Sequence, residues 1–570
     1  MKTEEETQTL PETSVSAVSV PTLKFYALGG LGEIGMNCYI LESGKDLIII
    51  DCGQMAPEEE MLGIDLVIPD FSQILTRKED VRGIVLTHAH EDHIGALPYL
   101  LPEISAPVYG SPLTLGILNF KLKEYDLLER TQLYELEPRI PVELGCFKVI
   151  PYTVSHSVAD AFGLIVETPL GNMVFSGDYK FDPNPHPGER FDYATVSQYG
   201  DMGILALFGD STNVDRKGAT PSESEVVLEL DRLFHEARQT LVVSCFASSI
   251  HRIKTILSLA QKHGRYVFPA GLNMVRNIQI GRELGYIEAD DSLFRDVRKL
   301  TSTSPHKRLL LSTGSQGEPL SVMSRLALDD YKWLNLEKGD TVIISARMIP
   351  GNEKGILRMI NHFARRGARV HYEWVDKVHA SGHAYRDDVK NLIQLTRPLY
   401  LIPIHGEYRH LQEHKNLGIE MGIPEDDIFV IEDGNVIEFS SEGVRRAGDV
   451  LTGHVLVDGK GVGDIGEVVL RDRMHLSQHG MLIAILAIDS TTGDLAAGPY
   501  IITRGFVFVD ESEDLLEEAA AIVKEAFEEF GPESREDWGV VKTAVRKALK
   551  KFIKKRTARF PMILPVVLEI

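Results

Sequence analysis

Short apolar runs separated by turn residues fill the chain up to Asp210. Runs of this length, bounded by Gly, Pro, Asn and Asp, predict β-strands. Periodic stretches at residues 94–101 and 113–127 predict two helices. Together they indicate a sheet-rich α/β layer with functional loops at the strand ends. The predicted strands are residues 23–28, 37–41, 47–51, 83–87, 147–154, 162–167, 172–176 and 204–208.

The pattern changes after Thr220-Pro221-Ser222-Glu223, where apolar strands alternate with amphipathic helices. Thr220 or Ser222 is the expected N-cap of the first helix, residues 226–234. The alternation predicts parallel βα units and therefore a separate domain. Histidine-rich segments resume at residues 378–383 and 401–405, so the simplest account is an insertion. The other predicted strands are residues 240–245, 266–269, 308–312, 341–345 and 368–373, and the other helices are 251–261, 274–284 and 354–364.

The C-terminal part predicts a small α+β module. Strand-like stretches at residues 452–457, 467–470, 481–488 and 498–503 precede helices at about 512–529 and 535–556 and an apolar run at 562–568. At 570 residues the chain is too long for one core. The expected organisation is a flexible N-terminal tail (1–21), a first domain in two parts (22–213 and 377–450), an inserted domain (214–376) and a C-terminal domain (451–570).

The charge balance is acidic. The 60 Lys and Arg residues against 83 Asp and Glu residues give a formal net charge of −23. This argues against a general polyanion binder, but local fields and bound metal ions dominate at a site, so nucleic acid stays possible. The basic run Lys550-Lys551-Phe552-Ile553-Lys554-Lys555-Arg556, with Arg559, is the local exception. The solvated face of a helix is the favoured interpretation of that run.

Several classes of protein are disfavoured. No apolar run approaches the length that crosses a bilayer, so no membrane partner is expected. Residues 1–21 are acidic and rich in Ser and Thr, without an apolar signal core. Cys38, Cys52, Cys146 and Cys245 show no paired spacing, which favours buried thiols in a reducing cytoplasm over disulfides or cysteine zinc sites.

The segment Thr87-His88-Ala89-His90-Glu91-Asp92-His93 carries the strongest chemical signal. It holds three histidines and two carboxylates directly after the apolar run Ile84-Val85-Leu86. Imidazole and carboxylate are ligands that suit zinc, and their density on a strand-end loop is enough to gather two cations. A polar surface loop with chance histidines is the weaker interpretation.

Gly30-Leu31-Gly32-Glu33-Ile34-Gly35 fits a dinucleotide-binding fingerprint, but its context does not. The fingerprint requires a helix after the glycines to hold the pyrophosphate. The following residues, 36–41, are β-prone and lead into the run 48–51, so two strands joined at Ser43-Gly44-Lys45 are expected. We therefore expect the glycines to let the backbone pass close to the metal site.

Further candidate ligands occur singly at predicted strand ends. They are Asp51, His156, Asp178 and His405. One such residue alone is more often a turn or capping residue. A sheet, however, brings its strand ends together along one rim, where ligands converge in α/β layers. Their shared placement therefore favours one site.

In combination these motifs resemble a known family. His88-x-His90-x-Asp92-His93 with Asp51, His156 and Asp178 is similar to the dinuclear zinc site of the metallo-β-lactamase fold. The inserted domain, with Asp210, His383 and His405, resembles the β-CASP branch of nucleic-acid nucleases. Residues 28–37, Asp210-Ser211-Thr212-Asn213, Ser315-Gln316-Gly317-Glu318-Pro319 and residues 403–409 resemble the ribonuclease J family. Ser249 departs from it, because the family usually has Asn there, which leaves the role of Ser249 open.

The resemblance implies a fold and a ligand set. The fold is a metallo-β-lactamase αββα sandwich with an inserted parallel α/β β-CASP domain and a small C-terminal α+β domain. One zinc ion would take His88, His90 and His156, the other Asp92, His93 and His405, and Asp178 would bridge both. Manganese or magnesium could replace zinc. Asp51 would accept a hydrogen bond from a ligand imidazole or contact the bridging water. Asp210 would support the site, with an Asx turn as its alternative role.

The implied reaction is zinc-dependent hydrolysis of RNA phosphodiesters. Asp92, His383, Asp51 and Asp210 are the expected catalytic residues, with His383 stabilising charge or protonating the leaving oxygen. The resemblance implies 5′-to-3′ exonuclease activity that favours a 5′-monophosphate on single-stranded RNA, with endonuclease activity as well. Ser248, Ser249, His251, Ser381 and His383 are the candidate phosphate donors, and turn chemistry is the alternative for the serines. A homodimer or homotetramer is expected.

Three alternatives stay open at this point. A small-molecule metallo-hydrolase is disfavoured because the inserted domain would cover an open cleft. A β-CASP DNA-repair nuclease is the closer rival, but DNA-specific relatives tend to carry valine in place of His405. A non-catalytic RNA-binding scaffold is disfavoured by the intact ligand set.

Overall fold

The computed structural model describes residues 22–318, 320–349, 351–507, 512–530 and 538–570. The predicted tail, residues 1–21, lies outside them. The described chain divides into two compact units. The first runs from residue 22 to Ala56 and from Val67 to Val455, and the second comprises Pro57–Leu66 and Leu456–Ile570. The domain boundaries after residues 213, 376 and 450 remain predictions.

Two β-sheets pack face to face in the first unit. One has the order β22-β21-β1-β3-β4-β6-β7-β8 and the other β19-β13-β12-β11-β10-β9. A buried apolar cluster joins their inner faces, where the ring centroids of Phe25 and Phe208 lie 4.3 Å apart. The strands are β1 (Leu23–Gly29), β3 (Cys38–Ser43), β4 (Asp46–Ile50), β6 (Val81–Val85), β7 (Val108–Gly110), β8 (Leu133–Glu135), β9 (Val142–Leu144), β10 (Phe147–Thr153), β11 (Phe162–Thr168), β12 (Gly171–Phe175), β13 (Ile204–Asp210), β19 (Tyr400–Ile404), β21 (Asn435–Ser440) and β22 (Gly443–Asp449).

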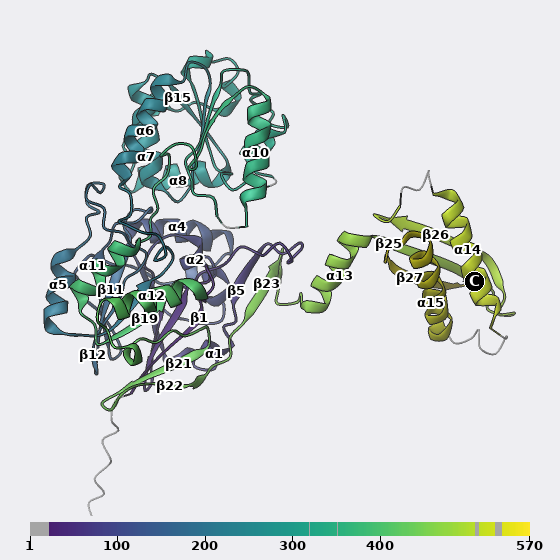
Figure 1. Cartoon of the computed structure of the whole chain (residues 1–570), viewed down its shortest axis with the longest axis horizontal. Helices are drawn as coiled ribbons and strands as arrows, with labels where there is room; N and C mark the ends of the chain where they lie inside the picture. Colours follow the sequence, from purple (N-terminus) through teal and green to yellow (C-terminus); the bar gives the residue numbers. More distant parts are fainter. Residues whose placement is uncertain (1–21, 319, 350, 508–511, 531–537) are drawn as a thin grey trace, which may run out of the picture. The chain divides into compact units, whose positions relative to one another are not determined.

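Helices cover this pair of sheets. The apolar faces of α5, α11 and α12 share a second buried cluster with the outer face of the β9–β13 sheet, and α4 contacts β7 and β8. Helices outside two packed sheets give the predicted αββα arrangement (Figure 1). The helices are α1 (Ser72–Leu75), α2 (Glu91–Ile94), α3 (Leu97–Leu100), α4 (Pro112–Glu124), α5 (Tyr193–Met202), α11 (Arg386–Thr396) and α12 (Tyr408–Glu420).

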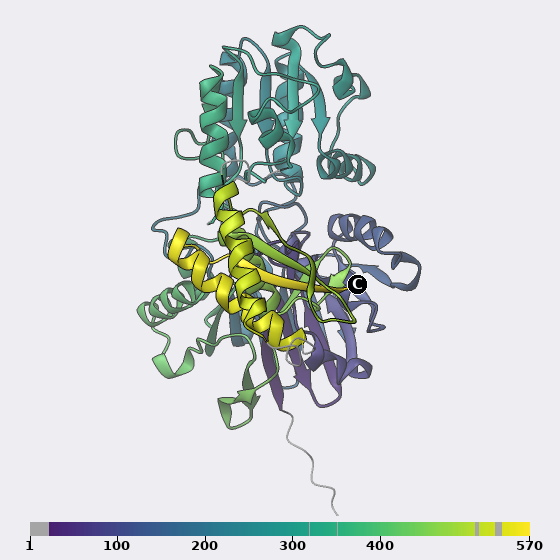
Figure 2. The same ribbon diagram turned by 90° about the vertical axis from the view of Figure 1, so that its right-hand side faces the viewer.

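The inserted segment forms the predicted parallel α/β layer. Its five strands have the order β15-β16-β14-β17-β18 and pair in parallel. The strands read as continuous apolar runs because helices bury both faces of the sheet (Figures 1 and 2). Ser222 is the N-cap of α6 and accepts a hydrogen bond from the Ser224 backbone N–H. The elements are β14 (Leu241–Ser244), β15 (Tyr266–Ala270), β16 (Arg308–Ser312), β17 (Thr341–Ile344), β18 (Arg369–His371), α6 (Glu223–Glu236), α7 (Ile250–Lys262), α8 (Leu272–Glu283), α9 (Val322–Ala327) and α10 (Glu353–Arg365).

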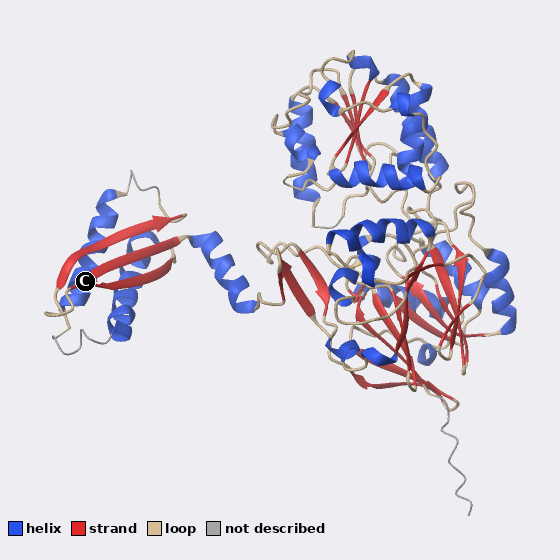
Figure 3. Ribbon diagram, turned by 180° about the vertical axis from the view of Figure 1, so that it is seen from behind, coloured by secondary structure: helices blue, strands red, loops and turns tan. Residues whose placement is uncertain are grey.

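The second unit contains a three-stranded sheet and two long helices with a core of their own (Figure 3). β25 (Met481–Ile488) lies between antiparallel β26 (Leu495–Arg504) and parallel β27 (Met562–Glu569). The helices α14 (Glu513–Glu528) and α15 (Trp538–Thr557) pack on this sheet through residues such as Phe527 and Leu549. The predicted strand at residues 467–470 is wrong, because these residues begin helix α13 (Glu467–His479).

The remaining elements are short. The glycine-rich segment contains β2 (Leu31–Gly32) and then leads into the β3–β4 hairpin, so no helix follows it, as expected. The other strands are β5 (Leu66–Pro69), β20 (Gly406–Glu407), β23 (His454–Asp458) and β24 (Gly461–Val462). The 3₁₀ turns are η1 (Lys78–Asp80), η2 (Leu128–Arg130), η3 (Asp291–Leu293), η4 (Val297–Lys299), η5 (Pro305–Lys307) and η6 (Glu425–Asp427).

Gly53 marks the place where the chain after β4 crosses the histidine-rich loop. A Cβ atom at Gly53 would lie 1.6 Å from the Asp92 carbonyl oxygen. The neighbouring backbone is tied to the same loop, because Cys52 N–H donates to the His93 carbonyl and Asn37 N–H to the Asp92 carbonyl. These backbone contacts hold the histidine-rich loop in place and leave no room for a side chain at Gly53.

Gly53→Ala should therefore destabilise the protein by displacing backbone against backbone. We expect a loss of about 2 kcal/mol or more in the free energy of unfolding, measured by denaturant titration. Gly453→Ala is the matched control, since nothing lies within 4 Å of a Cβ there. Equal stability of the two variants would contradict this close approach.

Candidate metal centre

The histidine-rich loop lies between β6 and α2. Strand β6 ends at Val85, and α2 begins at Glu91 with His90 as its N-cap residue in an extended conformation. The single turn of α2 turns His93 back toward the end of the strand, where its backbone N–H donates to the His90 carbonyl. His88 and His93 are buried as a result.

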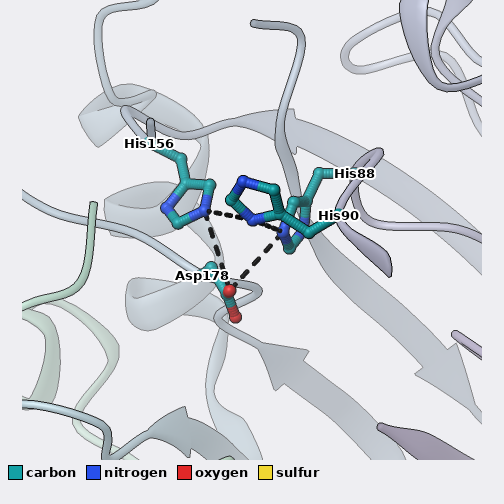
Figure 4. Close-up of side chains that lie close together, drawn as sticks. All are labelled: His88, His90, His156 and Asp178. Atoms are coloured by element: carbon teal, nitrogen blue, oxygen red, sulfur yellow. Dashed lines mark hydrogen bonds and ion pairs between the residues drawn. The ribbon is translucent and has the colours of Figure 1, made fainter. Parts of the chain in front are cut away.

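Four ligand atoms from three strand ends meet beside this loop. The His90 Nδ1 atom lies 2.9 Å from His88 Nε2 and 3.2 Å from His156 Nε2. Asp178 Oδ2 lies 3.5 Å from His88 Nε2 and 3.7 Å from His156 Nε2 (Figure 4). All four atoms lie within 4.8 Å of one another, which is the spacing of a metal-ligand group.

A second group adjoins the first. Asp92, His93 and His405 also place one ligand atom each within 4.8 Å of the others. The two Nε2 atoms of His93 and His405 lie 3.3 Å apart. Asp178 faces both groups, because its Oδ2 lies 3.3 Å from His93 Nε2 and its Oδ1 3.5 Å from His405 Nε2. The structure thus brings together all seven predicted ligands.

Outer hydrogen bonds set the tautomers of two of these histidines through carboxylate or carbonyl acceptors. His93 Nδ1–H donates to Asp51 Oδ2 at 2.7 Å, and His156 Nδ1–H donates to the Gly382 carbonyl at 2.9 Å. A carboxylate or carbonyl oxygen can only accept, so each proton lies on Nδ1. The Nε2 atoms that face the cluster therefore carry lone pairs.

Two threonines fix the tautomers of His88 and His405 in the same way. Thr87 Oγ1–H donates to Asp51 Oδ2 and thus accepts from His88 Nδ1 at 3.0 Å. Thr212 Oγ1–H donates to the His405 carbonyl and accepts from His405 Nδ1 at 2.6 Å. The two threonines were not predicted as site residues, although each stands inside a predicted motif.

The donor set fits divalent metal ions. Four imidazole lone pairs and the buried Asp178 carboxylate point at one another, and Asp178 Oδ2 has no hydrogen-bond donor among the described residues. Such an arrangement is repulsive unless cations occupy it, since a buried charge needs a partner. Imidazole and carboxylate without thiolate suit zinc or manganese. The cluster is therefore suited to bind divalent metal ions.

The protonation equilibria differ between the two groups, and only the histidines of the first group favour the neutral imidazole. Burial lowers the pKa of His88 well below its usual value, that of His90 to about 4 and that of His156 to about 3. Burial also lowers the pKa of His93, but the carboxylates of Asp178, Asp51 and Asp92 outweigh it and raise the value well above its usual range. The same competition, with Asp178 and Asp92, raises the pKa of His405 to about 9. A metal ion would take the place of that proton, because ligands bind it deprotonated.

Asp51 and His405 adopt left-handed backbone conformations, with φ of 60° and 53°. This conformation costs on the order of 1–3 kcal/mol for a residue other than glycine. Asp51 offsets it by accepting hydrogen bonds from both the backbone N–H and the hydroxyl of Thr87. The backbone strain thus occurs at Asp51 and His405, two residues whose side chains contact the cluster.

Asn37 is a further residue that the sequence did not single out. Its Nδ2–H donates to the Asp92 carbonyl and lies 3.1 Å from His93 Nε2, while Tyr39 O–H donates to Asn37 Oδ1. Asn37 and Asp92 are 55 residues apart in the chain, so no local sequence pattern could reveal this contact.

His383 and Asp210 form a pair beside the two groups. His383 Nδ1–H donates to Asp210 Oδ2 at 2.9 Å. Asp210 Oδ1 also accepts from the Thr212 backbone N–H, so its Asx turn exists as well. Burial raises the pKa of Asp210, but His383 outweighs it and lowers the value. His383 is the more exposed partner, with 19% of its side chain accessible against 2% for Asp210.

A cavity of about 650 Å³ opens beside His383, between the two-sheet layer and the inserted domain. Ser248, Ser249, Ser381 and His383 line it, whereas His251 does not. His251 instead pairs with Glu189 and stacks on His186, with ring centroids 4.2 Å apart. The structure thus brings together four of the five predicted phosphate donors. Four arginines that the sequence analysis did not select also line the cavity, namely Arg216, Arg252, Arg347 and Arg409.

Family models match four segments of the chain. Residues 31–215 match the metallo-β-lactamase superfamily, and residues 238–363 match the ribonuclease J β-CASP domain. Residues 367–430 match the Zn-dependent metallo-hydrolase RNA specificity domain, and residues 468–570 match the ribonuclease J C-terminal domain.

Within the described residues, no helix has the length and apolar character of a membrane span.

Relatives align over almost the whole chain. Ribonuclease J2 of Bacillus subtilis (strain 168) is 41% identical, covering 96% of this chain and 99% of the relative. Ribonuclease J of Thermus thermophilus is 39% identical, covering 95% and 94%. A solved protein of unknown function from Enterococcus faecalis shares the fold, with a TM-score of 0.52 and 17% identity over 74% of this chain and all of that chain.

These matches favour the predicted ribonuclease over the DNA-repair, small-molecule and scaffold alternatives. They also confirm the predicted fold class. The chain belongs to the ribonuclease J family and is a metal-dependent ribonuclease that binds RNA.

Proposed function

We propose that this ribonuclease holds two zinc ions per subunit. His88, His90 and His156 would hold one, Asp92, His93 and His405 the other, and Asp178 would contact both. The observation that carries this proposal is the buried Asp178 carboxylate, which faces both groups while its Oδ2 lacks a hydrogen-bond donor among the described residues. Manganese or magnesium could replace zinc, because nitrogen and oxygen donors accept each of them.

The proposed reaction is hydrolysis of an RNA phosphodiester that leaves a 5′-phosphate and a 3′-hydroxyl. Two bound divalent cations would lower the pKa of water toward neutrality and neutralise charge on the phosphate. Asp51 and Thr212 would hold protons on the Nδ1 atoms of His93 and His405, so that both Nε2 atoms stay turned inward.

His383 is the proposed proton donor to the leaving 3′-oxygen. Asp210 holds the His383 Nδ1–H, which leaves Nε2 available on the cavity side. Imidazole is the side chain that most often serves as a general acid. Asp210 would act as a positioning residue that orients the imidazole and stabilises its charged form.

The proposed mode of action is 5′-to-3′ exonuclease cleavage favouring a 5′-monophosphate, with endonuclease activity as well. The support is the cavity beside His383, whose volume lies in the range of pockets that bind small ligands. Within the described residues the Ser248 hydroxyl makes no hydrogen bond, so it can donate to a phosphate oxygen. Arg347, also in the wall, could pair with a phosphate through its remaining N–H groups.

We further propose a homodimer or homotetramer in the cytoplasm. β26 and β27 are the outer strands of the C-terminal sheet, and outer strands offer backbone groups for pairing. Cys38, Cys52, Cys146 and Cys245 are all free, which suits a reducing compartment.

His88→Ala tests the metal centre and the direction of cleavage together. Wild type should release mononucleotides from 5′-monophosphorylated RNA faster than from 5′-triphosphorylated RNA, and His88→Ala should lose metal and at least about 10³-fold in rate. Product mapping on 5′-labelled and 3′-labelled RNA and elemental analysis measure both. His306→Ala, an exposed histidine remote from the cluster in sequence, is the control. Identical products from all three proteins would refute the assigned centre.

His383→Ala separates proton donation from metal binding. We expect kcat to fall by about 10²–10⁴-fold with the metal content unchanged, because general acid catalysis supplies a factor of that size. Asp210→Asn should give a smaller loss and a shifted pH–rate profile, since the imidazolium would lose its carboxylate partner. A His383→Ala variant that keeps the wild-type kcat would rule out this role.

A further inference from the structure

The C-terminal unit contains a cavity that takes no part in the metal centre. It has a volume of about 590 Å³ and lies between α13, α15 and β27. All of its lining residues fall between Asp472 and Leu564, within one compact unit. The proposed ribonuclease reaction makes no use of it.

Cations dominate the polar part of the wall. Arg546 and Lys550 lie one turn apart on α15, and Arg559 follows the helix. In the described part of the chain no carboxylate pairs with these three, and one Arg559 N–H donates to the Phe506 carbonyl. Asp472 is the one acidic residue in the lining. A positive cavity stands out in a chain whose net charge is −23.

An aromatic ring lies among these cations. Phe560 is 38% exposed, and Lys554 Nζ lies 5.4 Å from its ring centroid. His479 meets the same ring edge-on at 5.8 Å. Met562 and Leu564 of β27 complete an apolar floor. Cations interleaved with an exposed aromatic are the features of single-stranded nucleic-acid sites, where phosphates pair with cations and bases stack on rings.

We propose that this cavity is a second binding site for the single-stranded RNA substrate, apart from the metal centre. Arg546, Lys550 and Arg559 contact phosphates, and a base stacks on Phe560. An acidic protein segment would satisfy the cations but would gain nothing from the ring, so RNA is the better fit. The inference rests on RNA being the substrate and is independent of the direction of cleavage.

The test is RNA binding by the full-length protein in a His88→Ala background, which prevents hydrolysis during the measurement. The probe is a fluorescent single strand of about 30 nucleotides, followed by anisotropy at several salt concentrations. The cavity variant is Arg546→Gln with Lys550→Gln. The matched control is Lys547→Gln with Lys551→Gln, which removes the same charge from exposed positions of the same helix outside the cavity.

We expect the cavity variant to weaken binding on the order of tenfold at 0.1 M salt, and its log–log salt slope to fall by about 1.4, because single strands lose about 0.7 per phosphate contact. The control pair should change the Kd less than twofold. Phe560→Ala should weaken binding severalfold with an unchanged slope, because stacking carries no charge.

Equal losses in the two charge pairs, or no loss in either, would overturn the proposal. A cavity variant that changes the sedimentation mass while RNA affinity stays constant would assign the surface to a second copy of the chain, which also overturns it. Cleavage is measured in a separate assay, with the same cavity substitutions in a protein that retains His88. A protein that binds RNA through this cavity but releases no mononucleotides would refute the proposed exonuclease mode alone.

Discussion

The site depends on electrostatic repulsion between buried ligand atoms, which bound cations would relieve. Four imidazoles have their protons fixed on the outward Nδ1 atoms, so their inward Nε2 atoms carry lone pairs. These lone pairs converge on the buried carboxylate of Asp178. In water such groups would be hydrated, but inside the protein they are compensated only by a bound charge. Metal binding is therefore coupled to the stability of the loops that carry the ligands.

The fold provides the rigidity that this arrangement requires. Ligands sit at the ends of strands whose register is fixed by the buried faces of two packed sheets. Asp51 links the first sheet to the histidine-rich loop, and Gly382, from the segment after the inserted domain, anchors His156. The inserted domain forms one wall of the cavity beside His383, and His90 and Asp92 of the candidate metal centre line the same cavity.

The sequence revealed the chemistry of the site better than its supporting contacts. The convergence of the seven predicted ligands was foreseeable because histidine and aspartate at strand ends form a recognisable pattern, and a sheet gathers such ends along one rim. Thr87, Thr212 and Asn37 could not be predicted, since hydroxyl and amide side chains are common in loops and their partners are distant in sequence. His251 was predicted as a phosphate donor from its position near Ser249, but one turn of α7 directs it to Glu189.

Many elements with a buried face could be predicted from their apolar period. Strands of the inserted sheet and the helices α14 and α15 follow their apolar patterns closely. The helices α11 and α12 also bury apolar faces but were not predicted. A wrong prediction is residues 467–470, where Val468, Val469 and Leu470 suggested a strand. These residues begin α13, which buries none of its side chains, so the apolar run reflects no core face. Pattern arguments fail there because they assume that apolar residues are buried.

The most direct test of the account is the metal content of the purified protein and of its Asp178→Asn variant, measured by elemental analysis on the same preparation. The account predicts about two divalent ions per chain in the wild type, and loss of at least one of them when the shared carboxylate becomes a neutral amide. A metal-free wild type, or an Asp178→Asn protein that retains both ions, would contradict it.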